Sequence, residues 1–259
     1  MVFLFLVVDT LQHMRKLIAY PLTCIYFLFF GFFLLVFHPI QWLCFNVFGY
    51  QAHKKSVDYL NFFLTRCLHL LGIRFDIKGR EHLPKNVPTI IVANHQSMND
   101  IPPIIWFLRK CHTKFISKKE LGKGIPSVSY NLRHGGSVLI DRKDPMQAVN
   151  AIKKMAAYIE KHNRGVVIFP EGTRSRDGKP KPFQTRGLRT LFAEAPNAYV
   201  IPISINNSWK TLIYGKFPYG IGITMKYKIH KPLKISDYNS DDLLALIEAT
   251  IKKDIVINE

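Results

Sequence analysis

A histidine and an aspartate stand five residues apart in "NHQSMND", where His95 and Asp100 follow the apolar run "TIIVA". A neutral imidazole can take a proton from a hydroxyl group, and a carboxylate beside it can hold its tautomer and stabilise the imidazolium. The two side chains would lie on opposite faces of a strand, and roughly 140° apart on a helix. They can meet only if the chain turns between them. The stretch therefore predicts either an ordinary polar loop or a catalytic loop.

Two further polar clusters follow apolar runs. Arg142 comes directly after "SVLID", and "PEGTRSR", which contains Glu171 and Arg174, comes after "GVVIF". Ligands of open α/β sheets collect outside the carboxyl ends of the strands. We therefore expect all three clusters to lie at one edge of a sheet.

The elements that would position these clusters are readable from the hydrophobic pattern. Short, nearly continuous, β-branched apolar runs are typical of strands buried on both faces, and five occur: "PTIIVAN", "KFIS", "SVLID", "GVVIF" and "YVIPISI". Apolar residues at three- to four-residue spacing predict a helix from Val57 to Leu71. A second helix is predicted after Asp144, with Pro145 at its first position and an apolar face reaching Ile159. The alternation predicts an α/β fold with a single sheet flanked by helices.

The N-terminal part of the chain is almost uncharged. No Lys, Arg, Asp or Glu occurs from Leu17 to His53, and residues 17–37 form an apolar run long enough to cross a bilayer as a helix. A secretory signal would have a shorter apolar core, of about 7–15 residues. Pro39 interrupts the run, so both one membrane span and two short helices in one leaflet fit the pattern. We expect residues 1–53 to form a hydrophobic membrane anchor and residues 54–259 to form the α/β domain.

The chain also has a second plausible starting point. Met14 precedes two cations and the apolar segment, in "MRKLIAYPL". Residues 1–13 are accordingly interpreted as a possible upstream extension.

Charge and cysteine content narrow the class of protein. The 259 residues contain 36 Lys and Arg against 18 Asp and Glu, a net charge of +18. Residues 1–53 account for only +1, so the rest of the chain carries +17 and favours an anionic partner: nucleic acid, a membrane surface or a phosphorylated substrate. The four cysteines show no metal or redox spacing.

Four blocks, in order, resemble the lysophospholipid acyltransferase family, the 1-acylglycerol-3-phosphate acyltransferases. The first is the His-four-residues-Asp block of His95 and Asp100. The second is "GGSVLIDR", ending at Arg142, with Lys118 in the preceding "SKKEL". The third is "FPEGTRSRDG", and the fourth is "VIPISI". The resemblance covers roughly residues 57–205 and leaves residues 1–50 and 206–259 without a counterpart.

The resemblance implies a membrane-bound enzyme that moves a fatty acyl group from acyl-CoA or acyl-carrier protein to the sn-2 hydroxyl of 1-acylglycerol-3-phosphate. The product would be phosphatidic acid, a phospholipid precursor. It implies no metal and no cofactor beyond the acyl donor as co-substrate, and a catalytic domain facing the cytoplasm. His95 and Asp100 would be catalytic. The substrate would be bound by Lys118, Arg142, Glu171, Gly172, Thr173 and Arg174.

Other functions remain open at this point. The acceptor could be another lysolipid, such as a lyso-amino-lipid. A nucleic-acid-binding protein would explain the charge, but not the 37-residue uncharged segment, and no groove-reading motif is present. A non-catalytic protein on a degenerate scaffold would be expected to lack His95 or Asp100, and both are intact. Ser97, close to the histidine, is interpreted as a helix cap rather than a nucleophile.

Overall fold

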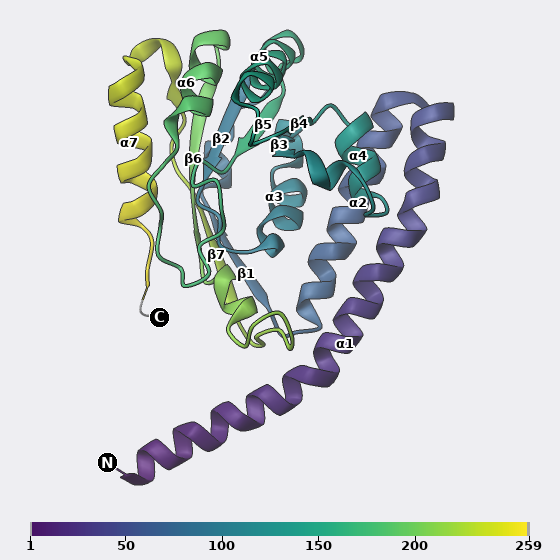
Figure 1. Cartoon of the computed structure of the whole chain (residues 1–259), viewed down its shortest axis with the longest axis vertical. Helices are drawn as coiled ribbons and strands as arrows, with labels where there is room; N and C mark the ends of the chain where they lie inside the picture. The colour runs from purple at the N-terminus through teal and green to yellow at the C-terminus, as the bar shows by residue number, and fades with distance from the viewer. Residues whose placement is uncertain (1, 258–259) are drawn as a thin grey trace.

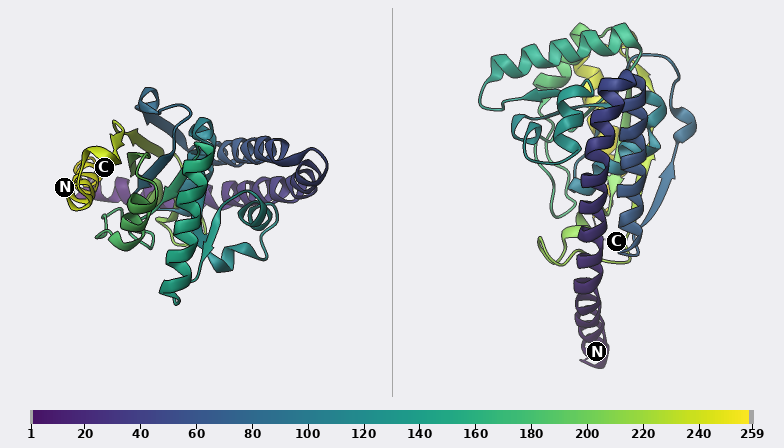
Figure 2. Two further views of the ribbon diagram at one scale, coloured as in Figure 1. Left: turned by 90° about the horizontal axis from the view of Figure 1, so that it is seen from above. Right: turned by 90° about the vertical axis from the view of Figure 1, so that its right-hand side faces the viewer.

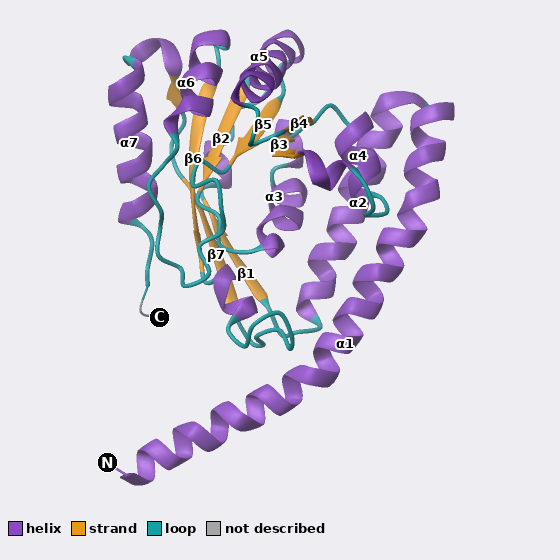
Figure 3. Ribbon diagram, in the orientation of Figure 1, coloured by secondary structure: helices purple, strands orange, loops and turns teal. Residues whose placement is uncertain are grey.

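One mixed sheet forms the centre of the molecule (Figures 1 and 3). The computed structural model describes the backbone of residues 2–257 and the side chains from Thr10 to Ile257. Within these residues the strand order is β1-β7-β6-β2-β5-β3-β4, and the short β8 pairs with β6. The strands are β1 (Arg74–Lys78), β2 (Thr89–Ala93), β3 (Lys114–Lys118), β4 (Val138–Ile140), β5 (Gly165–Ile168), β6 (Tyr199–Asn206), β7 (Thr224–Ile229) and β8 (Leu233–Lys234).

Strand direction places the polar clusters at one edge. The neighbours β6, β2, β5, β3 and β4 all run parallel, whereas β7 is antiparallel to β6. The carboxyl ends of β2, β3, β4 and β5 therefore lie on the same side, and the predicted site residues lie at or just after these ends. The five apolar runs in the sequence form β2 to β6, and the predicted single sheet flanked by helices is confirmed.

Helices cover both faces of the sheet. On β2, Ile91 and Ala93 face a core shared with α2 (Gly49–His69) and α3 (Ile101–Phe107). Ile90 and Val92 face the other core, built with α5 (Pro145–His162), α6 (Thr185–Glu194) and α7 (Ser240–Lys253). A strand with both faces buried needs apolar residues at every position, which explains why "TIIVA" does not alternate.

The local helix signals were largely correct. The Asp144 carboxylate accepts hydrogen bonds from the backbone N–H groups of Met146 (3.1 Å) and Gln147 (2.9 Å), which makes Asp144 the N-cap of α5. Pro145 is the first residue of α5, as predicted. Helix α2 ends at His69, close to the predicted stop at Gly72, but it begins at Gly49, before the predicted start.

The uncharged segment forms one continuous helix. Helix α1 (Val2–Val47) runs for 46 residues through both Pro21 and Pro39, so Pro39 does not divide it into two helices. Both prolines lie on its exposed side, and α1 bends along its length (Figure 1). Residues 10–47 are long and apolar enough to cross a membrane. Residue 1 and the side chains of residues 2–9 lie outside the described part, and the upstream extension of residues 1–13 stays a prediction.

The C-terminal two thirds of α1 pack against the rest of the protein. Helices α1 and α2 lie side by side along one flank of the molecule (Figure 2). The ring of Phe33 stacks on Phe63 of α2 at 4.6 Å, and the Ser127 hydroxyl, at the start of α4 (Val128–His134), donates to the Leu34 carbonyl. The boundary predicted after residue 53 falls inside α2, and α1 shares side-chain contacts with the cores of the α/β domain. The division into anchor and domain stays a prediction about function.

Candidate active site

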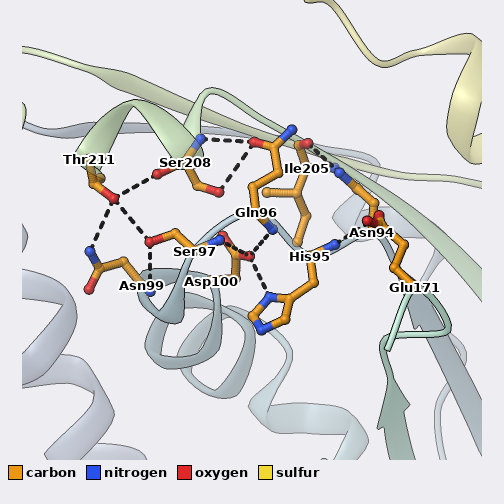
Figure 4. Close-up of polar contacts among 10 residues, drawn as sticks. All are labelled: Asn94, His95, Gln96, Ser97, Asn99, Asp100, Glu171, Ile205, Ser208 and Thr211. Carbon is orange, nitrogen blue, oxygen red and sulfur yellow. Dashed lines mark hydrogen bonds and ion pairs between the residues drawn. The ribbon is translucent and has the colours of Figure 1, made fainter. Parts of the chain in front are cut away.

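The chain turns sharply between His95 and Asp100. The Asn94 side chain first extends the sheet: its amide donates to the Ile205 carbonyl (2.8 Å) and its oxygen accepts from the Ile205 N–H (2.7 Å). The backbone then turns at Ser97, which caps the 3₁₀ helix η2 (Met98–Asp100), and the Asp100 side chain folds back toward β2 (Figure 4). The turn that the five-residue spacing requires is present.

One carboxylate oxygen closes this turn. Oδ2 of Asp100 accepts hydrogen bonds from Nδ1 of His95 (2.8 Å) and from the backbone N–H groups of Gln96 and Ser97 (2.9 Å each). Asp100 is fully buried, whereas 16% of the His95 side chain is exposed. A carboxylate only accepts hydrogen bonds, so Nδ1 carries the proton and Nε2 is the basic nitrogen. The pair is arranged as a general base with an orienting carboxylate.

The imidazole plane is fixed by an aromatic neighbour. The ring of Phe169, the first residue after β5, stacks on the His95 ring with centroids 4.2 Å apart and planes 19° apart. Together with the Nδ1 hydrogen bond, this contact restricts rotation of the imidazole. The sequence analysis did not identify Phe169, because a large apolar residue at a strand end carries no chemical signal of its own.

A second layer of hydrogen bonds ties the loop to the segment after β6. The Gln96 side-chain oxygen accepts from the N–H (3.1 Å) and hydroxyl (3.3 Å) of Ser208. The hydroxyls of Ser97 and Thr211 lie 3.0 Å apart, and both Ser208 and Thr211 belong to the 3₁₀ helix η5 (Ser208–Leu212) (Figure 4). Ser97 is completely buried and also accepts from the Asn99 N–H. These contacts support the predicted capping role of Ser97.

The loop after β5 is held against the histidine backbone. Oε1 of Glu171 accepts from the His95 N–H (3.2 Å), and the Ser175 N–H donates to the His95 carbonyl (2.7 Å). Gly172 lies between them at φ +70°, a conformation that glycine adopts without strain. A Cβ there would also approach the Gln184 amide at 3.1 Å. Gly172 thus allows the turn that returns Glu171 to His95.

Burial changes the titration of Glu171. The side chain is 3% exposed, and desolvation raises its pKa from the ordinary 4.5 to about 6, although its hydrogen bond from His95 opposes the rise. Its second oxygen, Oε2, is buried and has no hydrogen-bond partner among the described residues. That oxygen can accept a hydrogen bond from a bound hydroxyl.

The cations lie at the surface around this core. Thr173 and Arg174 are exposed, and the Lys181 ammonium donates to the Thr173 hydroxyl (2.8 Å) and the Arg174 carbonyl (3.0 Å). Glu171 and Arg174 form no ion pair with each other in the described structure. Lys181 was not a predicted site residue, because the loop that brings it to Arg174 is neither helix nor strand and has no hydrophobic pattern from which its path could be predicted. The Arg174 guanidinium is left without a carboxylate partner among the described residues.

Lys118 and Arg142 lie farther along the same edge. Lys118 ends β3, and Arg142 follows β4, whose Ile140 pairs with Lys118. Strands are about 4.8 Å apart, so these residues lie two and three strands from β2, roughly 10 and 14 Å. The Arg142 side chain is exposed, but partial desolvation lowers its pKa, and the nearby carboxylate of Glu120 opposes the change. The structure therefore joins His95, Asp100 and Glu171 directly, and leaves Lys118 and Arg142 as separate cations.

Comparison with known proteins identifies the family of this chain. The model of the family described as Acyltransferase matches residues 74–206, just over half of the chain. The chain belongs to the acyltransferase family. The match begins at β1 and ends with β6, so it includes every residue that the sequence analysis placed in the site. It excludes α1, α2, β7 and α7.

Individual relatives of this chain carry a more specific name. A chloroplastic 1-acyl-sn-glycerol-3-phosphate acyltransferase of Brassica napus is 33% identical over 159 residues, covering 61% of this chain and 44% of that protein. One of Borreliella burgdorferi is 27% identical over 189 residues, covering 72% and 73%. The chain spans about half the length of the first curated relatives it matches.

A solved structure extends the likeness to almost the whole chain. The crystal structure of the 1-acyl-sn-glycerophosphate acyltransferase PlsC from Thermotoga maritima superposes with a TM-score of 0.76. It is 25% identical in sequence and covers 94% of this chain and 96% of that one. Helices and strands outside the family match therefore have counterparts in a complete acyltransferase fold.

The raised pKa of Glu171 generates a prediction about stability. The folded protein holds the Glu171 proton up to about pH 6, whereas the unfolded chain releases it near pH 4.5. Ionisation therefore disfavours the folded state, and the wild type loses stability as pH rises through this window. Glu171→Gln cannot ionise and should avoid this loss. Denaturant unfolding should show the variant gaining stability relative to wild type from pH 4.5 to pH 7. A difference that is constant over this range would contradict the assignment.

Proposed function

We propose that this acyltransferase moves a fatty acyl group from a thioester to the sn-2 hydroxyl of 1-acylglycerol-3-phosphate, giving phosphatidic acid. The observation that carries the proposal is the His95 imidazole, held by Asp100 through Nδ1 with Nε2 left to accept a proton. The names of the relatives support the choice of acceptor. No seryl or cysteinyl nucleophile is needed, because the lipid hydroxyl can attack the thioester directly.

The proposed reaction uses His95 twice. Nε2 takes the proton of the acceptor hydroxyl as its oxygen bonds to the thioester carbonyl carbon. The imidazolium is stabilised by Asp100, whose negative charge is buried at hydrogen-bond distance. When the carbon–sulfur bond of the tetrahedral intermediate breaks, the imidazolium returns its proton to the thiolate. The products are the new ester and the free thiol of the donor, and the histidine is neutral again.

The surrounding cations are assigned to the anionic parts of the two substrates. Arg174, one strand from the histidine, is proposed to bind the acceptor phosphate, with Arg142 and Lys118 reaching from the same edge. Glu171 would accept a hydrogen bond from an acceptor hydroxyl through Oε2, and Gly172 and Thr173 would shape the loop around it. The donor is proposed to be acyl-CoA or acyl-carrier protein, since both carry phosphate that this basic edge attracts.

Attachment to a membrane is proposed through α1. Its exposed side carries large apolar side chains, among them Leu28 (69% exposed), Leu35 (63%) and Trp42 (55%). The opposite side of α1 packs on the protein. Even so, only 22% of its most apolar stretch is buried by protein, which leaves most of that stretch free to contact lipid. A helix that is covered along one side by protein fits best into one leaflet, with the α/β domain on the cytoplasmic surface and the basic residues toward anionic lipid.

The first prediction of the proposed function concerns the general base. His95→Ala should lower kcat by roughly 10²–10⁴-fold, because the imidazole accepts the proton in the transition state. The acceptor KM should stay nearly unchanged, because this interaction is not made when the acceptor binds. Asp100→Asn should also lower kcat, since an amide cannot stabilise the imidazolium by charge. Steady-state kinetics on the folded variants, with His162→Ala on the exposed end of α5 as control, measure both effects. Normal turnover in folded His95→Ala protein would return the loop to a purely structural role.

The second prediction separates acceptor binding from chemistry. Arg174→Gln and Arg142→Gln should each raise the acceptor KM roughly ten- to a hundredfold, with a much smaller change in the donor KM. Arg174→Lys should restore this only in part, because an ammonium lacks the bidentate geometry of a guanidinium. Arg176→Gln, an exposed arginine of the same loop, is the matched control. An unchanged acceptor KM in both variants would favour an acceptor without phosphate, such as a lyso-amino-lipid.

The third prediction concerns the membrane. Salt at 1 M shortens the Debye length to about 3 Å and removes the attraction of exposed cations for lipid, but leaves apolar burial intact. The protein should therefore remain on anionic vesicles in a flotation experiment at 1 M salt. Complete release by salt would mean that charge alone holds the protein and that α1 does not enter the leaflet.

A further inference from the structure

Helix α1 touches the catalytic loop directly. The Tyr26 side chain is 1% exposed, and its hydroxyl donates to Oδ1 of Asn99 at 3.2 Å. Asn99 is the residue immediately before Asp100. The contact joins residues 73 positions apart in the sequence, and it lies on the protein-facing side of the helix proposed to enter the lipid.

Contacts beside this hydrogen bond tie the same turn of α1 to the loop. The Thr23 hydroxyl, one turn earlier on α1, accepts from the Tyr219 N–H at 3.0 Å. The Tyr219 ring packs on the Tyr26 ring at 5.4 Å, and its hydroxyl lies 3.5 Å from the sulfur of Met98. Met98 and Asn99, two successive residues of the Met98–Asp100 turn, are thus in contact with α1 or with a residue that α1 holds.

Asn99 is held from two sides. Its side-chain oxygen accepts from Tyr26, and its side-chain nitrogen donates to the Thr211 hydroxyl at 3.4 Å (Figure 4). The amide therefore lies between the membrane helix and the η5 segment that supports Ser97. Removing the Tyr26 hydroxyl takes away the hydrogen bond that the buried Asn99 side-chain oxygen accepts, and Asn99 is then held only from the Thr211 side.

The lipid-facing side of α1 lies around the same turns. Leu28 and Phe29, two and three residues after Tyr26, are 69% and 43% exposed, and Phe32 is 52% exposed. A short stretch of helix thus presents apolar side chains outward and a hydroxyl inward to the catalytic loop. Small displacements of a reacting group lower catalytic rates steeply. A shift of α1 that moves the loop through the Tyr26–Asn99 hydrogen bond would therefore lower the rate.

We infer that Tyr26 is a positioning residue, whose hydrogen bond to Asn99 couples the seating of α1 in lipid to the placement of Asp100 and His95. The inference rests on the proposed acyl transfer and deepens it by naming a regulator of the site, the lipid surface itself. Tyr26 touches no reacting atom. Its effect acts through Asn99, and it makes turnover depend on how firmly α1 is held.

The test replaces one hydroxyl. Tyr26→Phe keeps the ring and should lower kcat on acceptor-containing vesicles about three- to tenfold, the loss expected from one hydrogen bond. The KM values of both substrates and vesicle flotation should stay near wild type, and the loss of one buried hydrogen bond should lower the thermal unfolding midpoint by only about 2–4 °C. Tyr20→Phe makes the same change six residues earlier, where the ring lies edge-on to Phe217 and is 40% exposed, and it should turn over normally. A purely structural role would instead lower the unfolding midpoint without a selective loss of kcat, and that result would overturn the inference.

Two further measurements examine the coupling. In a double-mutant cycle with Asn99→Ala, the kcat losses should be clearly less than multiplicative, because both changes remove the same hydrogen bond. With a short-chain acceptor dissolved as monomers and no lipid present, the deficit of Tyr26→Phe should shrink toward twofold or less. Multiplicative losses, or an equal deficit with and without vesicles, would overturn the coupling. If the wild type transfers no acyl group to any lysophosphatidate, the proposed function fails; an active wild type matched by Tyr26→Phe refutes only this inference.

Discussion

The arrangement of the site depends on one buried oxygen atom. Oδ2 of Asp100 accepts three hydrogen bonds, one from the His95 imidazole and two from backbone N–H groups. A carboxylate removed from water is costly unless such donors surround it. The donors must therefore stay in place whenever Asp100 is ionised, and this requirement fixes both the backbone turn and the imidazole. The same hydrogen bonds that stabilise the buried charge orient the proposed general base.

Much of the fold was predictable because the signals are local. Runs such as "TIIVA" predicted buried strands, and the cap at Asp144 predicted the start of α5, since each signal lies within one element. The turn between His95 and Asp100 was predictable for a similar reason. Neither regular helix nor strand geometry brings residues five apart together, so only a turn allows the contact.

The support of the loop was not predictable, because it comes from distant parts of the chain. Asn94 pairs with Ile205, and Asn99 contacts both Thr211 and Tyr26. These contacts depend on how distant segments are aligned in the folded protein, and the spacing of apolar residues along the sequence does not specify that alignment. The sequence likewise left open whether Pro39 divides the apolar segment, because it does not show that Pro39 lies on the exposed side of α1, where the helix continues through it. Two of these three supporting segments also lie outside the residues 74–206 matched by the family.

Burial separates the residues proposed for chemistry from those proposed for binding. Asp100 and Glu171 are at most 3% exposed, and each has one carboxylate oxygen hydrogen-bonded to the protein. Arg174 and Arg142 are exposed and form no ion pair with a carboxylate among the described residues. A buried charge obtains its hydrogen bonds from the protein itself, so its surroundings are built into the fold. An exposed guanidinium obtains its partner from solvent or from a ligand. The fold therefore specifies the proton-transfer groups closely, while the choice among anionic acceptors rests on the few contacts that the exposed arginines make.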